Sequence, residues 1–281
     1  MKILVTGGAG FVGTNLIKKL LKEEHKVSSL DNYDAGSVEN HQEGCSYHDF
    51  DIKKIKWFGN QYDIVFHMAA LSRIQPSFDN PKATFKTNTK GCLNVAEWAW
   101  KTNTKVIYAG SSSRWHNPYR SPYACFKHLG EEMFKMYKNV YELDVEICRF
   151  YNAYGPYEIV YGDWAAVIGK WRRQIMEGKP ITIVGDGEQR RDFTHVDDIV
   201  EALYKIGVGN YTHKDAWELG TGQNYSINEV AQMFQQKFNC NFEYIDDQKG
   251  NYKETLREND DALEQLDWKP QDRLLDYINS L

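Results

Sequence analysis

A tyrosine and a lysine stand four residues apart, at Tyr123 and Lys127, within a stretch whose pattern predicts a helix over residues 122–141. Residues at positions i and i+4 share a helix face, so we expect the phenol and the ammonium to be neighbours. A nearby cation favours the phenolate and lowers the pKa of a tyrosine. Tyr123 is therefore a candidate acid and base near neutral pH. A solvated pair on an exposed helix is the alternative interpretation.

A cluster of three serines follows the predicted strand at residues 105–109 after a single glycine, Gly110. Open parallel sheets bind their ligands at the carboxyl ends of the strands, so these hydroxyls are candidate substrate contacts. Ser111 lies just past the expected strand end and is favoured, with Ser112 and Ser113 as alternatives.

A glycine-rich turn occupies the beginning of the chain, where Gly7, Gly10 and Gly13 follow a short apolar run and precede a helical pattern. A second predicted strand, residues 26–30, ends at Asp31. Such glycines let the backbone approach a pyrophosphate, which the helix N-terminus attracts. Asp31 can accept hydrogen bonds from a ribose diol and would repel a 2′-phosphate, which favours NAD over NADP. A plain loop in an α/β domain is the alternative.

These residues require a scaffold of alternating strands and helices. Such alternation runs through the first half of the chain and predicts an α/β fold with a doubly wound parallel Rossmann sheet. A smaller mixed α/β lobe for the substrate is expected toward the C-terminus. The predicted strands are residues 45–50, 62–67, 105–109, 145–150 and 216–222, and the predicted helices are residues 83–101, 122–141 and 164–177. We expect an NAD-binding domain of residues 1–151 plus about 193–222, and a substrate lobe of residues 152–192 and 223–281.

Composition excludes several function classes. A net charge of −5 argues against a nucleic-acid binder. No apolar run approaches the ~20 residues of a membrane span. The first predicted strand begins at Lys2, so we expect no signal peptide and a cytoplasmic location. The five cysteines contain no C-x-x-C pair and the eight histidines show no ligand spacing, so we expect reduced thiols and no metal.

The spacing Gly7-x-x-Gly10-x-x-Gly13 resembles that of the short-chain dehydrogenase/reductase superfamily. The whole segment 6–13 is similar to its extended branch, which modifies nucleotide sugars. The resemblance implies a Ser–Tyr–Lys triad made of Ser111, Tyr123 and Lys127. In that family the serine positions the substrate hydroxyl, the tyrosine moves its proton, and the lysine binds the nicotinamide ribose. The family's aromatic residue four positions after the hydroxyl corresponds to Trp115, which also favours Ser111.

Further motifs resemble the family's cofactor site. Asp51 and Ile52 correspond to its adenine-contacting pair, residues 67–70 to its H-x-A-A turn, and Asn88 to a structural helix asparagine. The resemblance thus implies cofactor contacts from Gly7, Gly10, Phe11, Val12, Gly13, Asp31, Asn32, Asp51, Ile52, Ala69, Ala70, Leu71, Asn88, Tyr123 and Lys127.

Two stretches of the second half resemble nucleotide-sugar epimerases and dehydratases. Residues 149–156 are similar to R-x-x-N-x-Y-G-P, and residues 185–193 to G-D-G-x-Q-x-R-D-F. The resemblance implies that Asn152 and Arg191 contact the nucleotide diphosphate, with a salt bridge from Arg191 to a neighbouring aspartate, Asp192 or Asp197, as the alternative. Residues 165–168 resemble UDP-hexose and UDP-N-acetylhexosamine epimerases. The implied substrate contacts are Ser111, Ser112, Asn152, Val167 and Arg191.

The chain departs from the family pattern at two places. Tyr123 follows Ser111 by only twelve residues, so the active-site loop is short, and the pocket is either more open or covered by another segment. Gln248 stands where the family often has an arginine, so one phosphate contact is weaker or is made by Lys249.

Residue types next to Ser111 discriminate between reactions. In the family, 4,6-dehydratases carry Asp-Glu there and decarboxylases carry a Glu, whereas this chain has Ser112 and Ser113. Neither serine is a plausible acid at neutral pH. The sequence therefore favours C4 epimerisation through a 4-keto intermediate. Another nucleotide-sugar oxidoreductase or dehydratase is one alternative. A non-catalytic NAD-binding sensor is another, although such proteins typically lose the tyrosine or the lysine.

Two predicted helices, residues 83–101 and 122–141, carry more apolar residues than one core-facing side requires. An extra apolar face usually marks an interface, so we expect a homodimer through a four-helix bundle. Packing on the sheet alone is the alternative. The residues concerned are Phe85, Cys92, Ala96, Ala99, Trp100, Phe126, Leu129, Met133, Phe134 and Tyr137.

Overall fold

Seven parallel strands form the main sheet of the computed structural model, which describes residues 1–59 and 61–281. The strand order is β10-β6-β5-β4-β1-β2-β3, and every neighbouring pair is parallel. The order reverses between β1 and β4, which is the switch point where such sheets bind ligands. The predicted Rossmann-type sheet is confirmed. Its strands are β1 (Lys2–Thr6), β2 (Lys26–Asp31), β3 (Ser46–Asp49), β4 (Ile64–His67), β5 (Lys105–Ser111), β6 (Val145–Phe150) and β10 (Trp217–Leu219).

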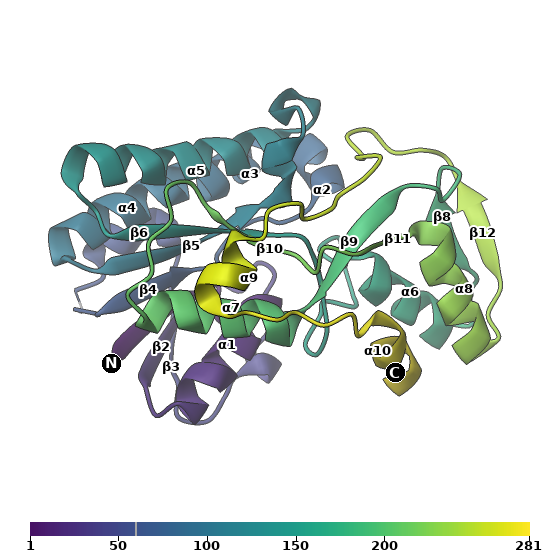
Figure 1. Ribbon diagram of the computed structural model, residues 1–281, viewed down its shortest axis with the longest axis horizontal. Helices are drawn as coiled ribbons and strands as arrows, with labels where there is room; N and C mark the ends of the chain where they lie inside the picture. Colours follow the sequence, from purple (N-terminus) through teal and green to yellow (C-terminus); the bar gives the residue numbers. More distant parts are fainter. Residues whose placement is uncertain (60) are drawn as a thin grey trace.

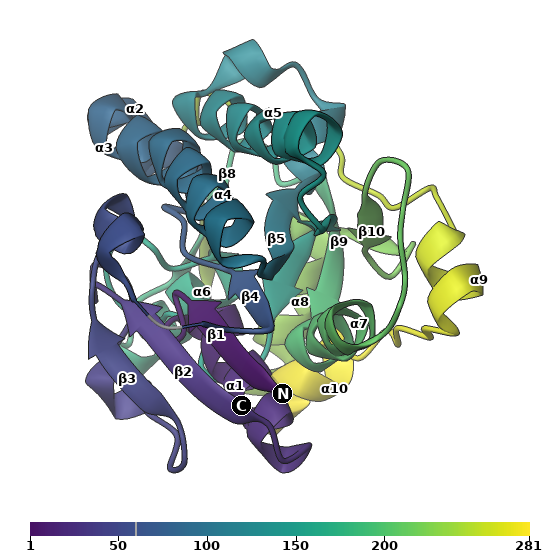
Figure 2. The same cartoon turned by 90° about the vertical axis from the view of Figure 1, so that its left-hand side faces the viewer.

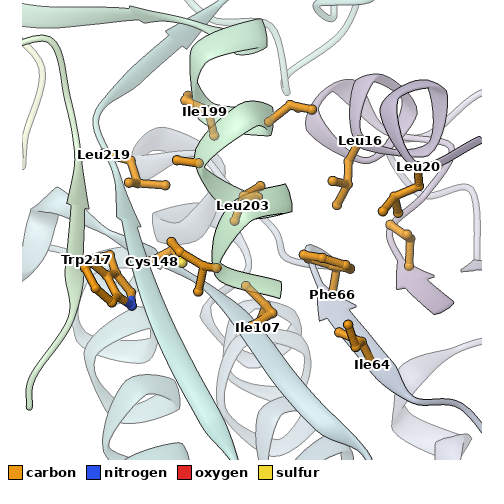
Figure 3. Packing of buried hydrophobic residues seen from close by; sticks show 14 of the residues in the cluster. Leu16, Leu20, Ile64, Phe66, Ile107, Cys148, Ile199, Leu203, Trp217 and Leu219 are labelled. Carbon is orange, nitrogen blue, oxygen red and sulfur yellow. The ribbon is translucent and has the colours of Figure 1, made fainter. Parts of the chain in front are cut away.

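Helices cover both faces of this sheet (Figure 2). Helices α1 (Phe11–Lys22) and α7 (Val196–Val208) lie on one face, and α4 (Gly91–Thr102) and α5 (Pro122–Tyr141) on the other. The strands are apolar because both faces are buried. Figure 3 shows the packing on the first face, where Leu16 of α1 and Leu203 of α7 meet Phe66 of the sheet.

The predicted helix at residues 83–101 is interrupted. It consists of α3 (Pro81–Phe85), a π-helical turn (Lys86–Lys90) and α4. Asn88 lies in the π turn, where its amide accepts a hydrogen bond from the Leu71 N–H (2.9 Å) and donates one to the Leu71 carbonyl (2.8 Å). The wider turn therefore fixes the loop after β4, in keeping with the frequent use of π turns near functional sites.

A smaller set of elements forms the second part of the molecule (Figure 1). A three-stranded sheet, β11-β9-β7, and a two-stranded sheet, β12-β8, pack with three helices around a core that includes Trp171 and Phe234. The elements are β7 (Asn152–Tyr154), α6 (Val167–Met176), β8 (Ile181–Val184), β9 (Arg190–His195), β11 (Asn224–Ser226), α8 (Ile227–Phe238), β12 (Phe242–Ile245) and α10 (Leu274–Ser280).

One helix departs from the predicted division into domains. Helix α9 (Asp261–Leu266) buries Ala262 and Leu266, followed by Trp268, in the core of the large sheet beside α7. The sequence interpretation assigned all of residues 223–281 to the substrate lobe. It could not separate α9 from that lobe, because the apolar spacing of so short a helix does not indicate which core the helix joins. The other proposed boundaries stay predictions.

The outer face of α4 and α5 differs from the expected one. Cys92, Ala96, Ala99 and Phe134 are buried against the sheet and leave no second apolar face of their own. Phe85 and Trp100 are each 42% exposed. Three exposed residues not named from the sequence, Met136, Val140 and Tyr141, extend the apolar surface on α5.

Within the described residues, no helix is long and apolar enough to cross a bilayer. The same part of the chain contains no group of three or more potential metal ligands, and its five cysteines are free.

Candidate active site

A cavity of about 870 Å³ opens at the carboxyl ends of the strands and extends to α6 and β9. Every residue predicted to bind cofactor or substrate lines it, except Asn88. Asn88 lies behind the wall and holds Leu71, which does line the cavity. Residues predicted from separate motifs are thus brought together in one space.

The glycine-rich turn fits a dinucleotide pyrophosphate. Gly7 has a φ of +70°, and a Cβ there would lie 2.8 Å from the backbone of Ala69. A Cβ on Gly13 would lie 2.1 Å from the Gly7 carbonyl oxygen. Helix α1 begins at Phe11, and no side chain of the described residues caps it. The first N–H groups of the helix, at its end beside the cavity, therefore donate to no side chain and are free for a ligand. This cradle matches an anion held by backbone groups.

Asp31 closes the turn from the end of β2. One of its carboxylate oxygens accepts the N–H of Ala9 and the other that of Tyr33, both at 2.9 Å. Burial raises the pKa of Asp31, while these backbone hydrogen bonds oppose the rise. Each oxygen keeps a further lone pair that a ribose hydroxyl can use. At the other end of this region, Asp51 caps a short 3₁₀ turn through the N–H of Lys53 (2.8 Å), and the cap orients its carboxylate at the cavity edge.

The three predicted catalytic residues converge at the ends of β5 and α5. The Tyr123 hydroxyl donates to Ser111 Oγ at 3.4 Å. Ser121 caps α5, and Ser77 accepts the N–H of Tyr123 (3.1 Å), which fixes the start of the helix. The phenol thus meets Ser111, while Ser112 and Ser113 are buried side chains that also line the cavity.

The Lys127 side chain reaches from α5 to strand β5. Its ammonium donates to the Ala109 carbonyl and lies 4.5 Å from the Tyr108 ring centroid. Burial lowers the pKa of Lys127 to about 8. The pKa of Tyr123 is raised by burial, opposed by the Ser111 hydrogen bond and by the charge of Arg73. Helical spacing places Lys127 beside Tyr123 but does not set its side-chain direction, so the predicted lowering by Lys127 is wrong for this structure.

The short loop after Ser111 is covered by a segment of the small lobe. His116 of the loop stacks on Tyr252 with ring centroids 4.0 Å apart and planes at 14°. The Lys249 carbonyl accepts a hydrogen bond from the Gln75 side chain (2.8 Å). Gln248, Asn251 and Tyr252 line the cavity, whereas Lys249 does not. The pocket is therefore walled by another segment rather than left open.

Arg191 and Asn152 line the cavity from β9 and β7. Within the described residues Arg191 has no carboxylate within 4.0 Å, and its one side-chain hydrogen bond goes to the Arg190 carbonyl. Of the two alternative partners, Asp192 is buried and accepts from Thr221, Gly222 and other groups, and Asp197 lies 3.6 Å from His195. The Asn152 amide donates to the Asp192 carbonyl (3.2 Å) and to Thr255 (3.0 Å), so a phosphate contact would have to replace one of these.

Further polar residues of the cavity were not identified from the sequence. Helix α6 begins at Val167 without a side-chain cap, and Lys170 and Arg173 of its first two turns line the cavity. Free N–H groups and two cations form an anion-binding surface. Arg73 lines another part of the cavity. Nothing in its local sequence pattern distinguishes it from a surface arginine.

The model of the NAD dependent epimerase/dehydratase family matches residues 3–220. The chain belongs to this family. A putative UDP-glucose 4-epimerase of Methanocaldococcus jannaschii is 30% identical over 293 residues, covering 96% of this chain and 93% of the relative. A UDP-glucuronate 4-epimerase of Thermodesulfobacterium geofontis is 31% identical over 303 residues, covering 95% and 91%. The crystal structure of UDP-glucose 4-epimerase from Thermotoga maritima with UDP-glucose has a TM-score of 0.92 at 26% identity, covering 99% and 96%.

The cofactor of this epimerase/dehydratase family member is NAD. The glycine turn, the uncapped start of α1 and Asp31 provide the cradle for it, as described above.

Asp31 should make this family member select NAD against NADP. The 2′-phosphate would meet the Asp31 carboxylate, with Asp34 also on the cavity wall. Like charges placed against each other cost several kcal/mol, so we expect NAD to bind at least about tenfold more tightly. Calorimetry with both dinucleotides measures this, and Asp31→Asn should reduce the difference. Tighter binding of NADP by the unaltered protein would contradict it.

Proposed function

We propose that this protein epimerises a nucleotide-diphosphate sugar at C4 through a 4-keto intermediate, with a UDP-hexose or UDP-N-acetylhexosamine as substrate. The observation that carries the proposal is the Tyr123 hydroxyl 3.4 Å from Ser111 Oγ, in a cavity that continues to the cationic wall of Arg191, Lys170 and Arg173. The sugar would lie at the first site and the diphosphate at the second.

In the proposed reaction, Ser111 holds the C4 hydroxyl and Tyr123 accepts its proton. Bound NAD supplies the hydride acceptor and, later, the hydride donor at C4. The ammonium of Lys127, a residue of α5, lies at the Ala109 carbonyl near the carboxyl end of β5, where it would contact the nicotinamide ribose. The 4-keto sugar then rotates, while Arg191 keeps the diphosphate in place by bidentate hydrogen bonds. Tyr123 returns its proton to the oxygen of the opposite epimer.

Elimination of water or CO₂ would need a further acid or base at the sugar. Ser112 and Ser113 supply none. One carboxylate of the cavity, Glu158, is ion-paired with Arg172 (2.9 Å) and accepts the Tyr277 hydroxyl (3.1 Å). Because Glu158 is already engaged by Arg172 and Tyr277, it is not available as that further acid or base. This supports epimerisation, which requires only the tyrosine. Relatives that act on UDP-glucose and UDP-glucuronate at C4 agree with the proposal.

A screen of UDP-, GDP- and dTDP-sugars without added NAD tests this function. We expect one or more UDP-sugars to be converted to their C4 epimers by cofactor that stays bound, with the products separated by chromatography. If no nucleotide sugar is interconverted, even with NAD added, the proposed reaction is wrong.

We also propose a homodimer through a four-helix bundle formed by residues 83–101, which include the end of α3 and most of α4, and by α5. The exposed side chains that support it are Phe85, Trp100, Met136, Val140 and Tyr141. Light scattering at micromolar concentration should give twice the mass of one chain, and Trp100→Glu should shift this toward the monomer. A monomer mass for the unaltered protein would exclude the dimer.

A further inference from the structure

Arg73 carries a charge that the protein leaves uncompensated. It lies in the loop between β4 and α2 (Ile74–Asp79), and its Nε donates to the Trp164 carbonyl at 2.8 Å. A weak contact at 3.5 Å joins its Nη1 to the Ser72 carbonyl. Within residues 1–59 and 61–281, no carboxylate lies within the 4.0 Å of an ion pair to Arg73. Most N–H groups of its guanidinium are thus free to bind a ligand in the cavity.

The surroundings do not neutralise this charge. Burial lowers the pKa of Arg73, partly offset by the nearby groups Tyr123 and Glu158. Glu158 is already paired with Arg172. Arg73, Glu158 and Arg172 together therefore carry one net positive charge. Arg73 is partly exposed in the wall of the cavity, where its free N–H groups are donors that an anionic group can use. We therefore expect its anionic partner to come from a ligand.

The position of Arg73 indicates which part of a ligand this is. Helix α2 starts at the next residue, and its Ser77 accepts the N–H of Tyr123 (3.1 Å), so the loop is anchored at the reacting end of the cavity. Arg191, Lys170 and Arg173 are further cations of the cavity, and Arg73 reaches the segment before α6 through the Trp164 carbonyl. The glycine turn at Gly7 to Gly13 forms the dinucleotide cradle. Because Arg73 also acts electrostatically on Tyr123, the residue that would serve the sugar, we assign Arg73 to the sugar rather than to the cofactor.

We propose that Arg73 binds a carboxylate on the sugar, so that the preferred substrate is a nucleotide-diphosphate hexuronic acid. This inference rests on the proposed C4 epimerisation, but it changes the preferred sugar from a neutral hexose to an acidic one. In a hexuronic acid the carboxylate carbon is two bonds from C4, which is the atom that Tyr123 would serve. The guanidinium fork matches a carboxylate with two parallel hydrogen bonds. A neutral hexose would leave Arg73 unpaired.

Substrate preference of the NAD-loaded protein tests the inference. We expect kcat/KM for UDP-glucuronate to exceed that for UDP-glucose by at least about tenfold. Arg73→Gln should lower kcat/KM for the uronate by roughly 10- to 150-fold, the usual effect of a charge-assisted contact, and change that for the hexose by less than about threefold. Arg73→Lys, which keeps the charge but not the fork, should be intermediate. Lys269→Gln removes a cation whose side chain is 82% exposed and should alter neither rate.

Other outcomes overturn the assignment. An equal loss for both sugars would mean that Arg73 acts on the diphosphate or only on the fold. Loss of bound NAD in Arg73→Gln would assign Arg73 to the cofactor pyrophosphate. If no sugar is epimerised, the reaction proposed above fails, and calorimetric binding then decides on Arg73 alone. Tighter binding of UDP-glucuronate than of UDP-glucose, lost in Arg73→Gln, would support the carboxylate site, and equal binding would refute it.

Discussion

Replacement of Tyr123 by phenylalanine should lower kcat by at least ~10²-fold, which is the usual contribution of general acid–base catalysis. The change removes only the hydroxyl that lies 3.4 Å from Ser111 Oγ. The ring and the helix start remain, so NAD should stay bound. Initial rates of epimer formation and the NAD content of the purified variant measure the two effects.

A matched control for Tyr123→Phe is available on the loop that precedes α5. Tyr119 is 86% exposed, so Tyr119→Phe removes an equal hydroxyl outside the cavity and should leave kcat unchanged. Near-normal activity of Tyr123→Phe would remove Tyr123 from the reaction.

The second large effect is expected at Arg191, where alanine should raise KM for the nucleotide sugar by roughly 10- to 150-fold, as for loss of a charge-assisted bidentate contact. Arg191 lines the cavity and has no carboxylate partner among the described residues. The diphosphate is held alike in the ground state and the transition state, so kcat should fall much less. Steady-state kinetics with the sugar identified by the screen separate the two parameters.

Arg191→Lys provides the comparison, because it retains the charge but not the planar fork. Its KM should lie between that of the unaltered protein and that of Arg191→Ala. An unchanged KM for every nucleotide sugar in Arg191→Ala would make Arg191 a structural residue. The diphosphate assignment would then be wrong.

Local patterns predicted most of the fold. Apolar strands, the glycine turn and the Tyr123–Lys127 spacing each depend on neighbours within a few residues, and the sheet and helix α5 agree with them. The position of Ser111 after a strand placed it at the carboxyl edge of the sheet. Its closeness to Tyr123 was implied by the family resemblance, and the 3.4 Å contact agrees with it.

Long-range packing was beyond these patterns. Side-chain direction at Lys127, the core joined by α9 and the cavity position of Arg73 are all set by contacts between distant segments. The wall contributed by Tyr252 is of the same kind, since its partner His116 is far away in the chain. A single sequence offers no signal for such pairs.

The stacking of His116 on Tyr252 makes the loop and the small lobe one unit for protein engineering. A longer loop transplanted from a relative would have to pass through the space that Tyr252 and Gly250 occupy against His116 and Ser121. Exchanges of the 112–121 loop alone should therefore give misfolded or inactive chimeras. Chimeras that also exchange residues 248–252 would keep a closed wall, so attempts to change the substrate range should move both segments together.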